Sequence, residues 1–151
     1  MSINGRSWTV LASLAFAGAA MAFDAVTLED YSGEELFGRF CASCHGSEAL
    51  GDGPVSRSLN VAVPDLTTIT RRYGEFPAGV IRDVIDGRGI DMRAHGTREM
   101  PVWGYEFWVE EGGDVTAQRA ARNAIDKLVE HLRSIQRADG ETRTPGSAAR
   151  Q

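Results

Sequence analysis

Cysteine, lysine and long apolar runs are all scarce in this chain. It has two cysteines in 151 residues, too few for a fold stapled by disulfides. Lys127 is the single lysine, and the arginines form no block. The formal net charge of -5 argues against a nucleic-acid binder, because a phosphate backbone needs a basic face. The apolar stretch at residues 8–23 is shorter than the roughly 20 apolar residues of a membrane-spanning helix. At 42% hydrophobic and 25% charged, the composition is that of a globular domain.

The N-terminus has the three-part layout of a secretory signal peptide. Arg6 supplies a positive charge, residues 9–19 are small and apolar, and Ala20-Met21-Ala22 forms an A-x-A cleavage pattern. We therefore predict a signal peptide at residues 1–22. Its presence predicts export to the periplasm, with no stable membrane insertion after cleavage.

The exported part is predicted to be one domain, residues 23–137, followed by a flexible polar tail at residues 138–151. Its clearest element is the last helix, which is expected to begin at Asp114 or Thr116 and to end at Asp139-Gly140. That helix carries a narrow apolar seam, suited to packing against another helix. The seam consists of Ala121, Ile125, Leu128, Leu132 and Ile135.

Shorter helices are predicted upstream. Ser32 and Glu35 form a capping box at the start of the first of them. Asp65 is placed to cap a second helix, and Pro77 is expected at the first position of a third, which Gly87 ends. Since no alternating strand pattern and no repeat is present, the predicted fold class is all-α with long loops. Loops this long in a small domain need something else to pack on, and a large prosthetic group would serve.

The run Cys41-Ala42-Ser43-Cys44-His45 is the C-x-x-C-H signature of c-type haem attachment. On a helical turn, Cys41 and Cys44 lie on the same face, so each sulfur can reach one vinyl group of the same porphyrin edge. His45 can then turn its imidazole under the ring and bind iron as the proximal ligand. Predicted export agrees with this reading, because haem is attached covalently outside the cytoplasm.

Three other readings of the cysteine pair are weaker. A thioredoxin-like redox pair needs a βαβ pattern, which is not visible. A structural zinc site needs two more ligands, and the available His95 and His131 lie 36 residues apart rather than in a close pair. A disulfide between Cys41 and Cys44 is uncommon across two intervening residues.

Met100 is the preferred sixth ligand of the iron. A thioether sulfur is soft and uncharged, and it raises the reduction potential. Pro101 stiffens the chain next to it. His95, Met92 and an open coordination site are the alternatives. Aromatic bulk follows Met100 and is expected to wall the distal side of the macrocycle. The aromatic residues are Trp103, Tyr105, Phe107 and Trp108, and Val102 lies beside them in the sequence.

The chain resembles the class I cytochromes c, specifically their bacterial secreted monohaem members, over nearly all of residues 23–137. Gly33 and Phe37 precede the C-A-S-C-H run as in that family. The remaining matching motifs are G-D-G-P at 51–54, P-D-L-T at 64–67, M-P-V-W at 100–103 and L-V-E-H-L-R at 128–133.

The resemblance implies a small all-α cytochrome c fold, in which several short helices and long loops wrap one covalently bound haem. The first and last helices would cross near Gly33, Phe37 and residues 128–132. A proline carbonyl would accept a hydrogen bond from the other nitrogen of the ligand histidine. Pro54 is the preferred acceptor, and Pro64 is the alternative.

A monohaem c-type cytochrome of this kind would carry single electrons between periplasmic or membrane redox partners and would not be an enzyme. Cys41, Cys44, His45 and Met100 would bind the haem c, with His45 and Met100 on the iron. An electron-accepting subunit of a periplasmic dehydrogenase or oxidase is the alternative, followed by a peroxidase or gas-binding module that uses His95. Arginines are the candidates to pair with the haem propionates. They are Arg71, Arg72, Arg88 and Arg98.

Overall fold

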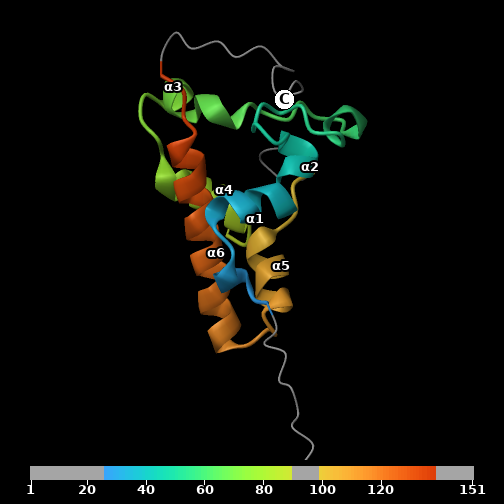
Figure 1. The fold of residues 1–151 in the computed structure, drawn as a ribbon, viewed down its shortest axis with the longest axis vertical. Helices are drawn as coiled ribbons and strands as arrows, with labels where there is room; N and C mark the ends of the chain where they lie inside the picture. Colours follow the sequence, from blue (N-terminus) through green and yellow to red (C-terminus); the bar gives the residue numbers. More distant parts are fainter. Residues whose placement is uncertain (1–25, 90–98, 139–151) are drawn as a thin grey trace, which may run out of the picture.

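The computed structural model of the chain describes residues 26–89 and 99–138, which form helices, turns and loops without a strand (Figure 1). The predicted all-α fold class is therefore confirmed. The predicted signal peptide at residues 1–22 and nearly all of the predicted tail lie outside the described residues. In chain order the elements are η1 (Leu28–Asp30), α1 (Gly33–Phe40), α2 (Ala42–His45), η2 (Ser56–Ser58), η3 (Leu66–Thr68), α3 (Ile69–Tyr73), α4 (Ala78–Asp86), α5 (Trp103–Glu110) and α6 (Val115–Ser134).

The long helix α6 is the element against which α1, α4 and α5 pack (Figure 1). Its start is fixed as predicted, because the Asp114 side chain accepts a hydrogen bond from the backbone N–H of Ala117 at 2.7 Å. The predicted seam is confirmed, with four of its five residues buried and Ile135 partly buried at the helix end. The buried face of α6 consists of Ala117, Ala120, Ala121, Ala124, Ile125, Leu128, Val129 and Leu132.

The end of α6 differs from the prediction. The helix stops at Ser134, before the predicted Asp139-Gly140, and Gln136 and Arg137 turn aside. The Gln136 amide donates to the backbone carbonyl of Leu66, and the backbone N–H of Arg137 donates to the carbonyl of Thr67. These bonds to η3 replace further turns of the helix.

Helix α5 was not predicted. It begins two residues after Pro101 without a side-chain cap. Its sequence is rich in aromatic residues, which the sequence analysis interpreted as lining for the macrocycle and not as a helix. Gly112 and Gly113, with φ of 100° and 75°, turn the chain so that α5 and α6 form an antiparallel pair (Figure 1). The fully buried Phe107 anchors α5 in the core.

The first helix crosses α6 where the resemblance placed the crossing. Ser32 and Glu35 cap α1 reciprocally, as predicted. At Gly33 the two backbones approach so closely that an added Cβ would overlap the carbonyl oxygen of Lys127. One turn later, the Phe37 ring packs at 5.3 Å from the ring of His131. This contact fixes the orientation of α1 and therefore the position of the segment that follows it, which begins at Cys41.

Helix α4 starts one residue later than predicted, since Pro77 is its N-cap, and Gly87 ends it in the left-handed conformation as expected. Ile85 is buried, whereas Val80 and Val84 are 51% and 42% exposed. Among the described residues, no helix is both long and apolar enough to cross a membrane.

Candidate functional site

The C-x-x-C-H segment is a tight turn between two helices. Cys41 ends α1 and begins α2, and its carbonyl accepts hydrogen bonds from the backbone N–H groups of Cys44 at 3.2 Å and His45 at 2.9 Å. The three functional side chains are therefore displayed from little more than one helical turn, as the spacing predicts. Both thiols are free, so the alternative of a disulfide between them is absent here.

The loop after His45 folds back onto this turn. The backbone N–H of Gly51 donates to the His45 carbonyl at 2.8 Å, and that of Gly53 donates to the Cys44 carbonyl at 3.2 Å. Gly53 has no room for a side chain, since a Cβ there would lie 2.5 Å from the Ser43 carbonyl oxygen. The loop therefore braces the backbone of the turn from outside.

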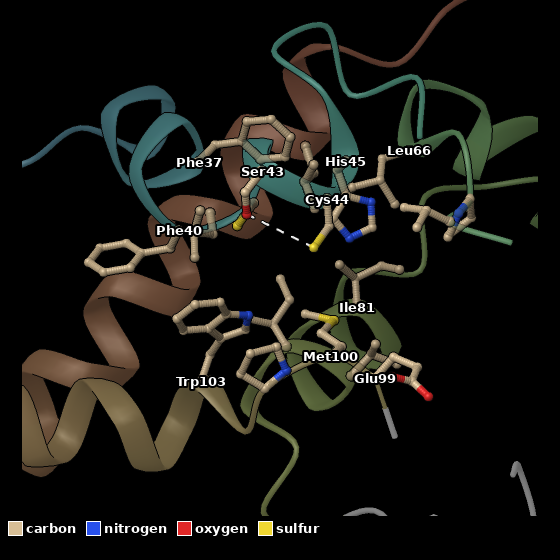
Figure 2. A pocket seen from close by; sticks show the side chains of 18 of the residues that line it. Phe37, Phe40, Ser43, Cys44, His45, Leu66, Ile81, Glu99, Met100 and Trp103 are labelled. Atoms are coloured by element: carbon tan, nitrogen blue, oxygen red, sulfur yellow. Dashed lines mark hydrogen bonds between the residues drawn. The ribbon is translucent and has the colours of Figure 1, made fainter. Parts of the chain in front are cut away.

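A cavity of about 310 Å³ opens beside the turn. Figure 2 shows His45 and Cys44 on one side of it and Met100 on the other, with the Met100 sulfur pointing toward them. Its walls are almost entirely apolar. Besides these residues, the lining consists of Phe37, Phe40, Cys41, Ser43, Leu59, Val61, Ala62, Val63, Pro64, Leu66, Ile69, Ile81, Val84, Ile85, Glu99, Pro101, Trp103, Leu128 and Leu132.

Burial favours the uncharged forms of Cys41 and His45. Desolvation, with a smaller effect of the neighbouring Cys44, raises the pKa of the Cys41 thiol to about 12. Desolvation also lowers the pKa of His45 below its usual value, against an opposing effect of the Pro64 carbonyl. At neutral pH the imidazole is therefore neutral, which is the form that can donate a lone pair to a metal.

The Nδ1 atom of His45 is buried and has no hydrogen-bond partner among the described residues. The backbone carbonyl that acts on the ring is that of Pro64, which also lines the cavity. This effect on the ring favours Pro64, the alternative, over the preferred Pro54. Pro54, unlike Pro64, does not line the cavity.

The aromatic residues after Met100 divide between two roles. Trp103 lines the cavity, where its ring packs against Phe40 at 5.5 Å and Phe107 at 5.4 Å. Tyr105 is half exposed and packs on Trp108, whose indole N–H donates to the Asp114 carbonyl. Of the aromatic residues expected to wall the macrocycle, only Trp103 lines the cavity, because helix α5 turns the others to different faces.

The three predicted arginine candidates that the structure describes do not line the cavity. Arg72 donates to the Asp65 carbonyl and the Thr68 hydroxyl, and Arg88 pairs with Asp86 at 2.6 Å. Arg71 is exposed. Arg98 lies outside the described residues, as do the alternative ligands Met92 and His95.

The other readings of the cysteine pair find no support in the described residues. No three His, Cys, Asp or Glu side chains gather there as a metal-binding group, and His95, one of the two histidines considered for zinc, lies outside the described residues. The βαβ unit of a thioredoxin-like pair is absent from the same ranges. His131 packs on Phe37 at the helix crossing, as a structural residue does.

The arrangement fits a covalently attached porphyrin. Two neighbouring thiols, a neutral imidazole and a thioether face one apolar cavity, and the imidazole keeps one buried nitrogen for an outer partner. Sequence reasoning missed the wall residues contributed by α4 and α6. The seam spacing of Leu128 and Leu132 marked them as buried, but it gave no sign that they face a cavity.

The family model described as "Cytochrome c" matches residues 32–136, which include the whole site and most of the chain. No curated protein and no solved structure matches the chain.

Proposed function

The chain belongs to the cytochrome c family, and from this premise we propose that it is a single-electron carrier with His45 and Met100 as its iron ligands. The family binds covalently attached haem c and uses it for electron transfer. When bound, haem supplies an iron that cycles between the ferrous and ferric states. The chain's own residues decide how that iron is held.

One observation carries the proposal: His45 and Met100, 55 positions apart in the sequence, line opposite sides of one apolar cavity (Figure 2). A neutral imidazole and a thioether are the ligand pair that raises the potential of a cytochrome c. With His45 and Met100 both bound to iron, the site would offer no open position to a substrate. An electron carrier needs this closure, whereas a peroxidase or gas-binding module needs the open position.

Each residue of the turn has a defined task. Cys41 and Cys44 would hold the group through thioether bonds, and His45 would bind iron through Nε2. A proton on the buried Nδ1 would leave the Nε2 lone pair for the metal. Met100 would bind through its sulfur, and Pro101 limits the backbone freedom of that ligand.

The walls exclude water from the site. Ile69, Leu128 and Leu132 are nearly fully buried and line the cavity. An apolar shell of this kind limits solvent access and so tunes the potential. It also lowers the reorganisation energy of electron transfer, because little water has to reorient when the charge on the iron changes.

The cellular setting of the proposal comes from the sequence. A signal peptide at residues 1–22 would direct the domain at residues 23–137 to the periplasm, and residues 138–151 would form a polar tail. There the carrier would exchange electrons with a membrane respiratory complex or a periplasmic dehydrogenase. A stable, stoichiometric complex with such a dehydrogenase would instead identify it as an electron-accepting subunit.

Carbon monoxide binding tests the ligand assignment. We expect the ferrous wild-type protein to bind CO slowly or not at all, because Met100 occupies the sixth position. Met100→Ala should bind it readily, with a visible shift of the absorption bands. Met92→Ala is the matched control, since it removes the other methionine of the mature chain, and it should behave as the wild type does. Immediate CO binding by the wild-type protein would contradict the proposal and favour a gas-binding or peroxidase role.

A further inference from the structure

The end of α4 and the starts of α5 and α6 are joined by a cluster of three polar residues. Asp86 is the last residue of α4, Arg88 follows it after the left-handed Gly87, and Gln118 lies near the start of α6. We call Asp86, Arg88 and Gln118 the polar brace. None of the three lines the cavity, so an effect of the brace on the site must pass through the helices that it joins.

Arg88 uses its guanidinium group in two directions. Its Nε and Nη2 donate to the two carboxylate oxygens of Asp86 at 2.7 and 2.6 Å, and its Nη1 donates to the amide oxygen of Gln118 at 2.8 Å. The side chains of Arg88 and Asp86 are only 30% and 23% exposed. A planar guanidinium that binds a carboxylate with two donors has a fixed orientation, which an ion pair with a single donor lacks.

Gly104 allows α5 to lie directly against this brace. A Cβ at Gly104 would lie 2.5 Å from Oδ1 of Asp86 and 2.6 Å from Nε of Arg88, closer than packed atoms approach one another. Gly104 is buried in the first turn of α5. The ion pair therefore occupies the space that a side chain would fill, and the backbone at the start of α5 rests on it.

Only three residues separate Gly104 from Met100, and each of them is restrained. The carbonyl of Val102 accepts hydrogen bonds from two backbone N–H groups of α5, at 2.9 and 3.0 Å. The Trp103 ring packs in the aromatic cluster and lines the same cavity as Met100 (Figure 2). Pro101 has a fixed φ. The position of Met100 at the cavity therefore follows the position of the start of α5.

We propose that Arg88 is a positioning residue: through the polar brace and Gly104 it holds the start of α5 so that the Met100 sulfur stays on the iron. The inference rests on the proposed function, in which Met100 is the sixth ligand. An uncharged thioether depends on the chain around it to present it to the metal in the right place. Loosening the brace increases the fraction of the protein in which the sulfur has left the iron.

Competition with imidazole in the ferric, haem-loaded protein measures that fraction. A nitrogen of imidazole takes the place of the Met100 sulfur, and its apparent affinity is proportional to the fraction of open sites. Arg88→Lys keeps the charge but loses the fork that joins Asp86 to Gln118. We expect this variant to bind imidazole about tenfold more tightly than the wild type, which corresponds to about 1.4 kcal/mol. Its charge-transfer band from methionine bound to ferric iron should also be weaker.

Two matched controls accompany the variants. Arg82 also pairs with an aspartate at 2.6 Å, but its partner is Asp126 and the pair joins α4 to α6, so Arg82→Lys makes the same chemical change away from α5. Gly104→Ala disturbs the brace from the side of α5, because the added methyl group would take the place of the ion pair. Its control is Gly79→Ala on α4, where a Cβ meets nothing within 4 Å. We expect Gly104→Ala to act as Arg88→Lys does, and both controls to bind imidazole as the wild type does.

A double-variant cycle distinguishes positioning of the ligand from a general loss of structure. Met100→Ala has no sulfur to displace, so the addition of Arg88→Lys should leave its imidazole affinity unchanged. An equal effect of Arg88→Lys in both backgrounds would show a merely structural role and would overturn the inference. Wild-type affinity in both Arg88→Lys and Gly104→Ala would overturn it as well, as would an equal rise in Arg82→Lys. The proposed function is judged separately, by the presence of the methionine band in the ferric wild-type protein.

Discussion

At the scale of single residues, the turn from Cys41 to His45 depends on a glycine ten positions or so downstream. Gly53 lies against the backbone of the turn and bonds to the Cys44 carbonyl. The atoms nearest to a Cβ at this position are the Ser43 oxygen at 2.5 Å, the Cys44 carbonyl carbon at 2.6 Å and the Ala42 oxygen at 2.7 Å. All three belong to the backbone, so no side chain can rotate away to make room.

Gly53→Ala should therefore destabilise the protein and displace the turn. Overpacking of this kind costs about 1–3 kcal/mol, and we expect a smaller yield of covalently attached haem as well. Gly38→Ala is the control, because its Cβ meets nothing within 4 Å on an exposed position of α1. It should stabilise the helix by about 0.5–1 kcal/mol. Urea unfolding and haem absorbance per protein measure both effects, and equal stability of the two variants would contradict the packing described for Gly53.

The residues predicted to bind the cofactor have local signals in the sequence, and the structure places all four at one cavity. Cys41, Cys44 and His45 form one short motif, and Met100 stood out next to Pro101 among few methionines. The proline that faces His45 was not predictable in the same way. Choosing between Pro54 and Pro64 requires the path of the loop between them, which depends on bonds such as that from Leu66 to Ala49.

At the scale of elements, the crossing of α1 and α6 brings a histidine into the core. His131 packs on Phe37 and is half buried. Burial lowers the pKa of His131 below its usual 6.5, and the negative charge of Glu34 on α1 opposes this shift only in part. The folded state therefore prefers the neutral ring more than the unfolded state does.

This preference predicts a pH dependence of stability. As the pH falls below the ordinary histidine pKa of 6.5, the unfolded chain binds a proton at His131 before the folded protein does, so stability is lost on acidification. Above that pH the contribution is fully present. We expect His131→Gln to lose less stability than the wild type between pH 7.5 and 5.5, measured by urea unfolding of the haem-loaded proteins. Because every other titratable group is shared, parallel losses in the two proteins would contradict this role.

Two buried aliphatic residues on α6 allow effects on stability to be distinguished from effects on the haem site. Ile125 and Leu128 are both 1% exposed, but only Leu128 lines the cavity. Ile125→Ala and Leu128→Ala should each cost about 2–5 kcal/mol. Only Leu128→Ala should also shift the haem spectrum and potential, because it alone opens space beside the cofactor. A similar spectral shift in Ile125→Ala would show that the cavity wall is not as described.

The boundaries of helices were predictable where a local signal exists. Ser32, Asp65 and Asp114 cap their helices as their side chains predict. Helix α5 lacks a capping side chain, and its stability comes from packing against α6, which no local pattern shows. The end of α6 is set by bonds from Gln136 and Arg137 to residues about 70 positions away.

At the scale of the whole molecule, the cavity is assembled from segments that are distant in the sequence. The turn at α2, the loop at residues 59–64, helix α4, the segment around Met100 and the seam of α6 each contribute one wall. The sequence predicts the fold class and the cofactor because motif and composition agree. It does not predict which apolar residues face the cavity, since that depends on how these segments pack together with α1, η3, α3 and α5.

The negative net charge of the molecule predicts that it reacts faster with positively charged redox partners. With a formal net charge of -5, the protein should attract positively charged reaction partners over distances set by the ionic strength. A cationic small-molecule oxidant should therefore react several-fold faster than an anionic one of similar potential. The ratio should shrink as salt rises to 0.15 M, where screening acts over about 8 Å. Stopped-flow kinetics measures both rates, and a ratio that is unaffected by salt would contradict this electrostatic preference.

An optical redox titration of the mature, haem-loaded protein tests the ligation by His45 and Met100 most directly. The absorbance to follow is the ferric charge-transfer band that arises from methionine bound to iron. The band should be present in the wild-type protein, disappear on reduction with a positive midpoint potential, and be lost in Met100→Ala with a fall in potential. Absence of the band from the ferric wild-type protein, or its persistence in Met100→Ala, would contradict the assignment of Met100 as the sixth ligand.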